Sequence, residues 1–235
     1  MTIIACTIDA IEPLTPTVNR VLLTPHTPIN YQSGQYLQIC LSDEDKRPFS
    51  IASHANSKQI ELHIGASVAD KYAGQALTHL QQLYAAKQPV LAEIGLGNAQ
   101  LRVDSDRPLI LLAGGTGFSY IYSIAQTLAK QQVNRPVFAY WGVRDQDALY
   151  HHPQMQQWAN SNPLYTFVPV VQNPTTQWQG RTGLVHQAVL EDFASLADFD
   201  IYIAGPFAMA GVVRDAFVQH GAERENMFCD AFAYI

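Results

Sequence analysis

The pattern of hydrophobic and polar positions divides the chain into two parts with different periods. In the first hundred residues, short runs rich in β-branched and aromatic residues alternate with clusters of Pro, Gly, Asn and Ser, which is typical of short strands joined by turns. These runs are "VNRVLLTP", "QYLQICLS", "PFSIAS", "QIELHIG" and "PVLAEIG". They predict an antiparallel barrel or sandwich. One helix is expected at residues 71–83, where Tyr72, Ala76, Leu80 and Leu83 recur at helical spacing.

After about Leu101 strands alternate with helices. "PLILLAGG" is a continuous apolar run, as expected for a parallel strand buried on both faces, and "PVFAYWG", "TFVPVV" and "DIYIAG" follow it. Helices are predicted at residues 118–130, 154–160, 182–193 and 206–220. This alternation predicts a doubly wound parallel sheet. We therefore expect two domains, residues 1–101 and 102–235, which meet at the charged segment "RVDSDRP".

The amino-acid composition limits the classes of protein to which this chain can belong. The chain has 235 residues, 48% of them hydrophobic and 14% charged, with a formal net charge of −6. That balance indicates a compact globular protein and argues against a nucleic-acid partner, which requires a concentrated basic surface. Three cysteines, Cys6, Cys40 and Cys229, are far apart and form no CxxC, so we expect no metal site and no disulfide framework. The N-terminus lacks the basic region of a signal peptide, and a reduced, cytoplasmic protein fits best.

An uncharged stretch between Arg107 and Lys130 has about the length of a membrane span. However, "GGTG" interrupts it near its middle, and Ser, Tyr and Gln residues follow. A buried strand, a glycine turn and a helix explain the stretch better, so we expect no membrane segment here.

The glycine turn is the sharpest local feature. An apolar strand runs into Gly114, Gly115, Thr116 and Gly117, and a predicted helix begins directly afterwards. Glycine lets the backbone approach a ligand closely, and the free N–H groups at a helix start suit a phosphate. The spacing is neither GxGxxG nor a P-loop. A tight turn without a ligand is the alternative.

A second turn of this kind occurs in "IYIAGPFAM", where Gly205 ends a strand and Pro206 opens a helix. Both turns lie at carboxyl ends of parallel strands, where open α/β sheets bind their ligands. We expect both turns to face one crevice. The alternative is that the second turn only connects a strand to a helix and binds no ligand.

A third candidate is "KRPFS" in the first part of the chain. Arg47 has the charge to pair with a phosphate or an electron-rich carbonyl, and Ser50 can donate and accept a hydrogen bond. The alternative is a surface arginine at the opening of a strand whose phenylalanine packs in the core.

Taken in order, "RPFS", "AGGTGFSY", "AGPFAM" and the tail "DAFAYI" resemble the ferredoxin–NADP reductase-like superfamily. Within it, the chain is most similar to the NAD(P)H:flavin oxidoreductases of enteric and luminous bacteria, and the resemblance spans essentially the whole chain. It implies an antiparallel Greek-key flavin-binding β barrel followed by a nicotinamide-binding α/β domain with a doubly wound parallel sheet.

The resemblance also implies roles for individual residues. Ser50 is expected near flavin N5 as the catalytic, orienting residue, and Arg47 near the ribityl or phosphate end. The implied flavin-binding residues are Arg47, Pro48, Phe49, Ser50, His63, Ile64, Gly65, Ala66, Ser67, Phe232 and Tyr234. The implied nucleotide-binding residues are Gly114, Gly115, Thr116, Gly117, Phe118, Arg144, Gly205, Pro206 and Phe207. Arg144 suits a 2′-phosphate but Asp145 and Asp147 beside it oppose one, so the choice between NADH and NADPH stays open.

One departure from the superfamily bears on how the flavin is held. Relatives that keep FAD bound have Gly-x-x-Ser in the helix after the second flavin strand, whereas this chain has Gly74 to Leu77, with leucine in place of the serine. Loss of a charge-assisted hydrogen bond of about 1.5–3 kcal/mol weakens binding about tenfold or more. This favours FMN, riboflavin or FAD as an exchangeable substrate over a permanently bound cofactor.

The resulting hypothesis is reduction of free flavin by NADH or NADPH, with direct hydride transfer from nicotinamide C4 to flavin N5. A luciferase or a flavin-dependent monooxygenase is then a candidate consumer of the reduced flavin. The alternatives are a reductase component that keeps FAD and passes electrons to an oxygenase, a ferredoxin or a ferric acceptor, and a non-catalytic flavin- or nucleotide-binding regulator.

Overall fold

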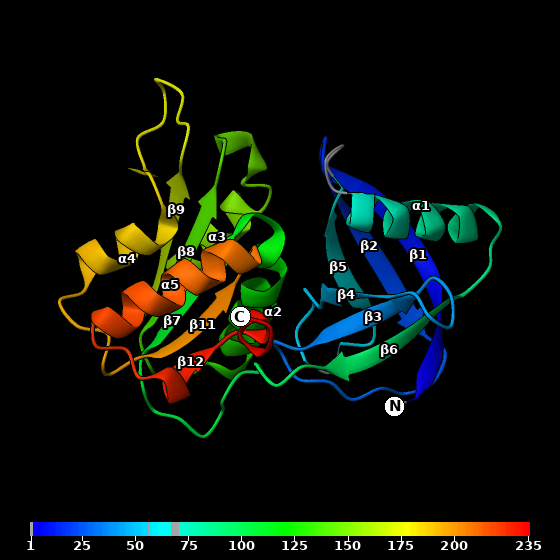
Figure 1. The fold of residues 1–235 in the computed structure, drawn as a ribbon, viewed down its shortest axis with the longest axis horizontal. Coiled ribbons are helices and arrows are strands. Elements are labelled where there is room, and N and C mark those ends of the chain that lie inside the picture. The colour runs from blue at the N-terminus through cyan, green and yellow to red at the C-terminus, as the bar shows by residue number, and fades with distance from the viewer. Residues whose placement is uncertain (1, 56, 67–70) are drawn as a thin grey trace. The chain divides into compact units, whose positions relative to one another are not determined.

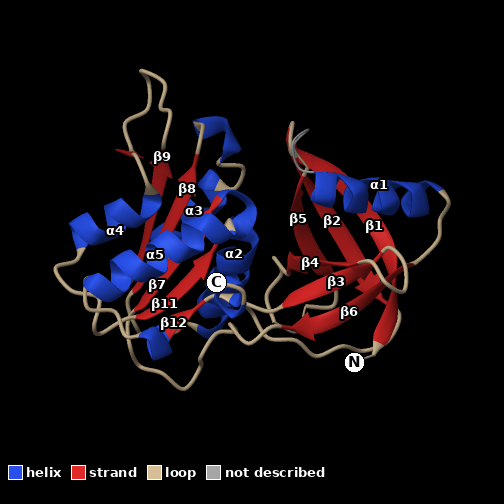
Figure 2. Ribbon diagram, in the orientation of Figure 1, coloured by secondary structure: helices blue, strands red, loops and turns tan. Residues whose placement is uncertain are grey.

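The computed structural model describes residues 2–55, 57–66 and 71–235 and divides into two compact units (Figure 1). The first unit contains Met1–Leu101 together with Tyr122–Thr127, and the second contains Arg102–Ile121 and Leu128–Ile235. Strands predominate over helices in the first unit, and the second alternates strands with helices (Figure 2).

The first unit is an antiparallel barrel. Its strands are β1 (Ile3–Thr15), β2 (Val18–Pro25), β3 (Tyr36–Cys40), β4 (Lys46–Ser50), β5 (Ile60–Gly65) and β6 (Val90–Leu96). They lie in the order β4-β3-β6-β1-β2-β5, and every pair is antiparallel. An isolated bridge between Ile51 and Leu62 joins the two edge strands, and the Ala52 N–H donates to the Glu61 carbonyl beside it at 2.7 Å. The predicted antiparallel barrel is confirmed.

Helix α1 (Lys71–Ala85) covers this barrel with one apolar face. Ala73, Leu77 and Leu80 are buried at the i, i+4, i+7 spacing of such a face. Burying a leucine of this kind stabilises the fold by about 1.5–3 kcal/mol. Tyr72 departs from the predicted apolar stripe, because its side chain is 50% exposed and lies over the guanidinium of Arg47 instead.

Strand β1 is covered by none of the predicted runs. In this strand Cys6 and Ile8 are buried, and the other described side chains are at least partly exposed. Asp9, Glu12 and Pro13 interrupt its apolar alternation. Pairing with both β2 and β6, rather than a pattern of its own, makes this segment a strand.

The second unit has a parallel sheet. Its strands are β7 (Leu109–Gly114), β8 (Val137–Val143), β9 (Tyr165–Val171), β10 (Arg181–Thr182), β11 (Asp200–Ala204) and β12 (Met227–Phe228). They lie in the order β10-β9-β8-β7-β11-β12, and every pair is parallel. The direction of winding reverses between β7 and β11, which makes this pair the switch point where such sheets bind ligands. The predicted doubly wound sheet is confirmed.

Helices and short 3₁₀ turns connect these strands. The helices are α2 (Phe118–Gln131), α3 (His152–Asn160), α4 (Val185–Asp192) and α5 (Phe207–Gln219). The 3₁₀ turns are η1 (Gly115–Gly117), η2 (Gln146–Ala148), η3 (Arg224–Asn226) and η4 (Asp230–Ala233). Helix α4 begins later than the prediction of 182–193, because Thr182 belongs to β10 and Gly183 turns the chain at φ +97°.

The sheet buries different residues on its two faces. Helices α4 and α5 pack on the face that carries Ile110, Leu112 and Tyr140, and Figure 1 shows them in front of the strands. Trp141, the next residue along β8, stacks on Phe118 of α2 on the opposite face. Consecutive residues of β8 therefore pack on opposite faces of the sheet, because side chains alternate along a strand.

The uncharged stretch before Lys130 is made of β7, η1 and α2, as expected from "GGTG". Across the described ranges, every helix falls short of the length and apolar character that crossing a bilayer would require.

Candidate functional site

The first glycine turn is built for close approach of backbone to backbone. Gly114 ends β7, and Gly115 at φ +56° adopts the left-handed conformation that favours glycine. A Cβ on Gly117 would lie 2.5 Å from the carbonyl oxygen of Ala204 and 2.8 Å from the nitrogen of Gly205. Because backbone atoms cannot move aside, only glycine fits at position 117.

The second glycine turn lies directly beside the first, since β7 and β11 are neighbours and Ala113 pairs with Ala204. The side chain of Met209 fills the space that both turns leave. A Cβ on Gly114 would overlap its sulfur, and a Cβ on Gly205 would lie 2.5 Å from its Cε. The structure therefore brings Gly114, Gly117 and Gly205 together at one carboxyl edge of the sheet.

An aromatic cluster supports the first turn from the α2 side. The indole Nε1 of Trp141 donates to the carbonyl of Gly115 at 2.9 Å, and the ring of Phe118 stacks on the indole at 3.8 Å. Tyr150 contacts both rings edge-on. Phe118 is fully buried in this cluster, so its side chain supports the turn and is not presented to a ligand.

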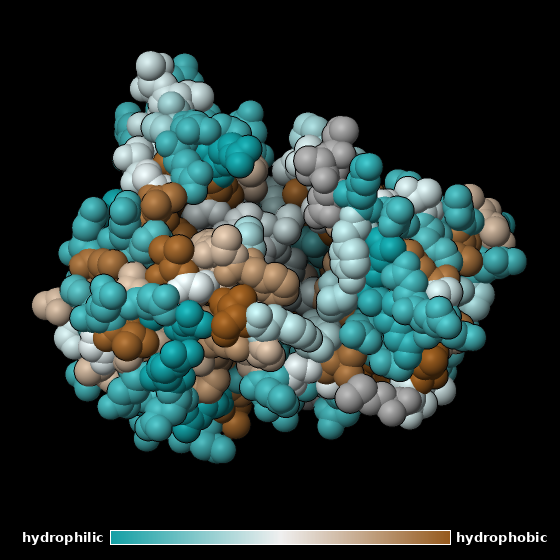
Figure 3. Space-filling view, in the orientation of Figure 1, coloured by the Kyte–Doolittle hydropathy of each residue, from teal (hydrophilic) through white to brown (hydrophobic). Residues whose placement is uncertain are grey.

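A cavity of about 430 Å³ opens beside the turns within the α/β unit. Its lining residues come from the ends of β7 and β8, from the residue after β9, and from the starts of α4 and α5. They are Gly114, Gly115, Gly142, Val143, Arg144, Gln172, Leu184, Val185, His186, Pro206, Ala208, Met209 and Val212. In Figure 3, brown and tan hydrophobic atoms gather over α4 and α5, where the exposed apolar residues include Leu184, Phe207 and Val212.

Gly142 shapes this cavity. A Cβ at this position would lie 2.6 Å from the Cβ of Val185, so glycine allows α4 to approach β8 closely. Arg144 follows two residues later and is exposed at the rim, where its guanidinium makes no ion pair within the described part of the chain. Asp145 accepts a long 3.5 Å hydrogen bond from the amide of Asn173.

In the barrel, "KRPFS" forms all of β4 and not merely its opening. Arg47 is buried and fully engaged. Its Nε and Nη2 donate to the two carboxylate oxygens of Asp45 at 2.8 and 2.7 Å, its Nη1 donates to the Tyr72 carbonyl, and the Tyr72 ring lies 4.4 Å from its Cζ. The ion pair with Asp45 raises the pKa of Arg47, which stays charged.

Ser50 is placed differently. Side chains alternate along β4, so Ser50 and Arg47 point to opposite faces of the strand. Phe49 lies on the Arg47 side and packs against the barrel core, while Pro48 is exposed. Ser50 is half-buried, and its hydroxyl makes no hydrogen bond to any residue in the described ranges, which leaves it available to a ligand.

The bridge between Ile51 and Leu62 brings β5 beside the end of β4. Extending its register sets Ser50 opposite His63, so two of the implied flavin-binding segments adjoin. Ile64 is a core residue at 0% exposure, Gly65 ends β5, and the Ala66 N–H donates to the Thr17 carbonyl at 2.8 Å. Ser67 lies outside the described residues.

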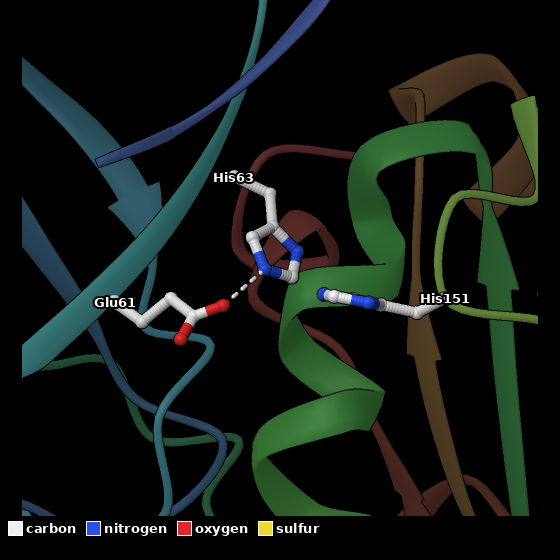
Figure 4. Close-up of side chains that lie close together, drawn as sticks. All are labelled: Glu61, His63 and His151. Carbon is white, nitrogen blue, oxygen red and sulfur yellow. Dashed lines mark hydrogen bonds and ion pairs between the residues drawn. The ribbon is translucent and has the colours of Figure 1, made fainter. Parts of the chain in front are cut away.

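His63 is held by a carboxylate. Its Nε2 hydrogen bonds to Glu61 at 2.9 Å, as Figure 4 shows, and Arg20 pairs with the other carboxylate oxygen at 3.1 Å. Burial alone would raise the pKa of Glu61, but the hydrogen bonds from His63 and Arg20 outweigh burial and lower that pKa from 4.5 to about 2. Glu61 is therefore a fixed anion that orients His63.

The two aromatic residues of the tail have different surroundings. Phe232 packs against the core of the α/β unit. Tyr234 is 73% exposed, and its ring lies 5.8 Å from that of Phe207, directly after the second glycine turn. The tail thus lies beside Phe207, one of the implied nucleotide-binding residues.

Several lining residues escaped the sequence interpretation. Gln172 and His186 belong to none of the quoted motifs, and Met209 ends the motif "AGPFAM" without having been assigned a role. Only their positions relative to the strands and helices could have indicated these residues. Gln172 directly follows a strand, and His186 and Met209 lie in the first turn of a helix.

Known proteins share this architecture. Residues 111–215 match a family described as the oxidoreductase NAD-binding domain. The NAD(P)H-flavin reductase of Aliivibrio fischeri is 44% identical over 99% of both chains. Among solved structures, an Amycolatopsis cytochrome P450 reductase matches 97% of this chain and 69% of its own with a TM-score of 0.85 at 26% identity. A ferredoxin NADP⁺ reductase from Neisseria gonorrhoeae shares the fold with a TM-score of 0.72 at 16% identity. The match covers 95% of this chain and 93% of the reductase chain. The chain therefore belongs to the NAD(P)H-flavin reductase family, with the two-unit fold of the ferredoxin–NADP reductases.

Proposed function

We propose that this protein reduces a flavin with NADH or NADPH. The observation that carries the proposal is the interlocked pair of glycine turns beside an open cavity at the switch point of the sheet. A Cβ on Gly115 would meet no atom within 4 Å, so the turn leaves room there for a nucleotide diphosphate to approach backbone N–H groups. The full-length similarity to NAD(P)H-flavin reductases supports the same function.

The chemistry would be supplied by the bound nicotinamide and flavin themselves, since a hydride passes from nicotinamide C4 to flavin N5. The chain's own contribution is to align the two rings and exclude water. Ser50 is proposed as the orienting residue, because its hydroxyl is available and lies on β4 beside His63. Phe49, Pro48 and the start of the β5–α1 segment, including Gly65 and Ala66, complete the proposed flavin platform.

The flavin is proposed to exchange freely. Arg47 supports this, since its guanidinium is already satisfied by Asp45 and by the Tyr72 carbonyl, so a flavin phosphate finds no unpaired charge there. Leu77 gives no support for free exchange of the flavin. It is a buried core residue of α1, so a serine in its place would face the barrel core and not a diphosphate.

At the nicotinamide end, the proposed contacts are the turn from Gly114 to Gly117, Gly205 and Pro206. Tyr234, whose ring lies tilted beside that of Phe207, is proposed to move away when a nicotinamide ring enters. Exposure of 73% for Tyr234 and 58% for Phe207 leaves little packing to oppose that movement. Reduced flavin is then proposed to leave for an acceptor such as a flavin-dependent monooxygenase or a luciferase.

Purified protein tests the proposal directly. A colourless protein that oxidises NADH or NADPH only after FMN or riboflavin is added is the expected result. Ser50→Ala is expected to lower kcat about tenfold or more, and Ser50→Thr, which keeps the hydroxyl, to retain more activity. A yellow protein with tightly bound FAD indicates the electron-transferring reductase instead, and binding without nicotinamide oxidation indicates a regulator.

A further inference from the structure

Helix α2 carries a polar face inside the protein. Ser123 and Thr127 are 0% and 7% exposed, and Gln126 is half-buried. Their i, i+3, i+4 spacing sets all three on one face of the helix. The stretch of α2 that holds them, Tyr122–Thr127, belongs to the first unit, together with the barrel. Serine and threonine are weaker helix formers than alanine or leucine, and a buried polar group is unfavourable without a partner, so the partners of this face should explain why it is polar.

The partners are backbone carbonyls in the segment that follows β4. Gln126 Nε2 donates to the carbonyl of Ala52 at 2.9 Å. Ser123 Oγ donates to the next carbonyl, that of Ser53, at 2.6 Å. These carbonyls come shortly after Ser50 in the chain. The polar face of α2 thus satisfies two consecutive carbonyls beside the residue that is proposed to orient the flavin.

A cluster of buried hydroxyls strengthens this contact. Ser33 Oγ lies 3.0 Å from Ser123 Oγ and 2.6 Å from Thr127 Oγ1. The same Ser33 oxygen accepts the N–H of Ala55 at 2.9 Å. Ser33 precedes β3 and is 2% exposed. Hydrogen bonds between groups that water does not reach are stronger than those at the surface, so the cluster fixes the segment after β4 against α2.

The N–H groups of the same segment bond to the barrel. The Ile51 N–H donates to the Gln35 carbonyl at 3.1 Å. The Ala52 N–H donates to the Glu61 carbonyl at 2.7 Å. Strand β4 ends at Ser50, so the course of the chain beyond it depends on these bonds and on those from α2. Barrel and helix together therefore hold both the donors and the acceptors of this segment.

The placement of the Ser50 hydroxyl depends on the segment. Peptide groups are planar, so fixing the groups that follow Ser50 restricts its own backbone torsions. A displacement of about 1 Å at a reacting group can slow catalysis about a hundredfold. We propose that Gln126 and Ser123 are positioning residues, which act on hydride transfer through Ser50 without touching the flavin. The inference rests on the proposed function and adds to it two residues of α2.

A double-mutant cycle tests whether these residues act through Ser50. Gln126→Met keeps the length of the side chain and removes the donor. It is expected to lower kcat about two- to tenfold and to leave the KM for NADH or NADPH unchanged. Ser123→Ala is expected to act in the same direction. In a Ser50→Ala background, Gln126→Met should have no further effect on kcat, because the hydroxyl that it positions is gone.

Gln59→Met is the matched control. Gln59 lies in the same unit, and its Nε2 donates at 2.8 Å to Asp9, an exposed residue of β1. This change is expected to leave kcat at the wild-type value. Two kinetic outcomes overturn the proposal. One is an unchanged kcat in both Gln126→Met and Ser123→Ala, and the other is the same loss from Gln126→Met with and without the Ser50 hydroxyl.

Amide hydrogen exchange gives a readout that needs neither flavin nor turnover. In Gln126→Met, the amides of Ile51 and Ala52 are expected to exchange about two- to tenfold faster than in the wild type. Amides of β1 and β2 should keep their rates, which separates a local effect from a general loss of stability. If the wild type reduces no flavin, faster exchange still shows that α2 holds this segment, and the proposed function alone fails. Unchanged exchange at Ile51 and Ala52 overturns the inference.

Discussion

The indole Nε1 of Trp141 donates a 2.9 Å hydrogen bond to the carbonyl oxygen of Gly115 and so connects strand β8 to the turn that follows strand β7. Gly115 is the residue of the turn that has a positive φ. Fixing its carbonyl fixes the orientation of the peptide group between Gly115 and Thr116. The stacked ring of Phe118 holds the indole in place.

Trp141→Phe keeps an aromatic ring in this cluster and removes the hydrogen bond. A net hydrogen bond contributes about 0.5–1.5 kcal/mol, so we expect the KM for NADPH or NADH to rise about two- to tenfold. The KM for flavin should be unchanged. Steady-state kinetics with each substrate varied in turn measures the difference.

Tyr140→Phe is the control for that variant. Tyr140 precedes Trp141, faces the other side of the sheet and donates to Asp192 at 2.8 Å. Its loss should lower the free energy of unfolding by about 1 kcal/mol and leave nucleotide kinetics unaltered. If both variants change nucleotide KM equally, the Trp141 bond has no specific role in the turn.

Gly117→Ala should disrupt both turns at once. The added Cβ would lie 2.5 Å from the Ala204 carbonyl oxygen, and relief requires the backbone of β11 to shift. We expect a loss of about 1–3 kcal/mol in the free energy of unfolding and weaker nucleotide binding. Urea unfolding and a dinucleotide titration check the two effects.

Gly74→Ala offers the opposite expectation for the same chemical change. Gly74 lies in α1, and a Cβ at this position would have no neighbouring atom within 4 Å. Alanine should stabilise the barrel by about 0.5–1 kcal/mol, because it restricts the unfolded chain. A destabilised Gly74→Ala would show that the space beside α1 is not open in solution.

Glu61→Gln is expected to show a pH-dependent loss of stability. The folded pKa of Glu61 is about 2, below its usual 4.5, so its ion pairs stabilise the fold above pH 4.5, by about 3 kcal/mol. That contribution falls as the pH drops from 4.5 toward 2. The difference in the free energy of unfolding between wild type and Glu61→Gln should therefore be large at pH 7 and small near pH 2.5. A difference that is independent of pH would contradict the assigned ion pairs.

Asp200→Ala should be among the most destabilising single changes in the α/β unit. Asp200 is fully buried at the start of β11, with Arg107 Nε and Arg135 Nη1 at 3.4 and 3.7 Å from its carboxylate. Removing it leaves buried positive charge, at a cost of about 3–5 kcal/mol. Asp198→Ala, at an exposed position two residues earlier, should stay within about 0.5 kcal/mol of wild type by the same urea measurement.

Local patterns predicted the elements that depend on few neighbours. The continuous apolar run before Gly114 and the periodicity of residues 118–130 were sufficient to locate β7 and α2. Strand β1 could not be recognised in this way, because its polar residues are tolerated on a partly exposed surface. Its identity depends on two partner strands, one of which is distant in sequence.

The same distinction applies to the candidate site. The glycine turns were visible because glycine is required there by backbone geometry. The engagement of Arg47 by Tyr72 was not visible, since it depends on where α1 packs, and the motif gave no sign of it. His186 reaches the cavity through long-range packing, which no short window of sequence contains.

The packing of Met209 between Gly114 and Gly205 has an evolutionary consequence. A side chain at position 114 or 205 requires the end of the Met209 side chain to move aside or residue 209 to be smaller, and at 205 the φ of +157° disfavours a side chain as well. Substitutions at these three positions should therefore occur together when related sequences diverge. The two turns, although far apart in the chain, are therefore expected to vary together.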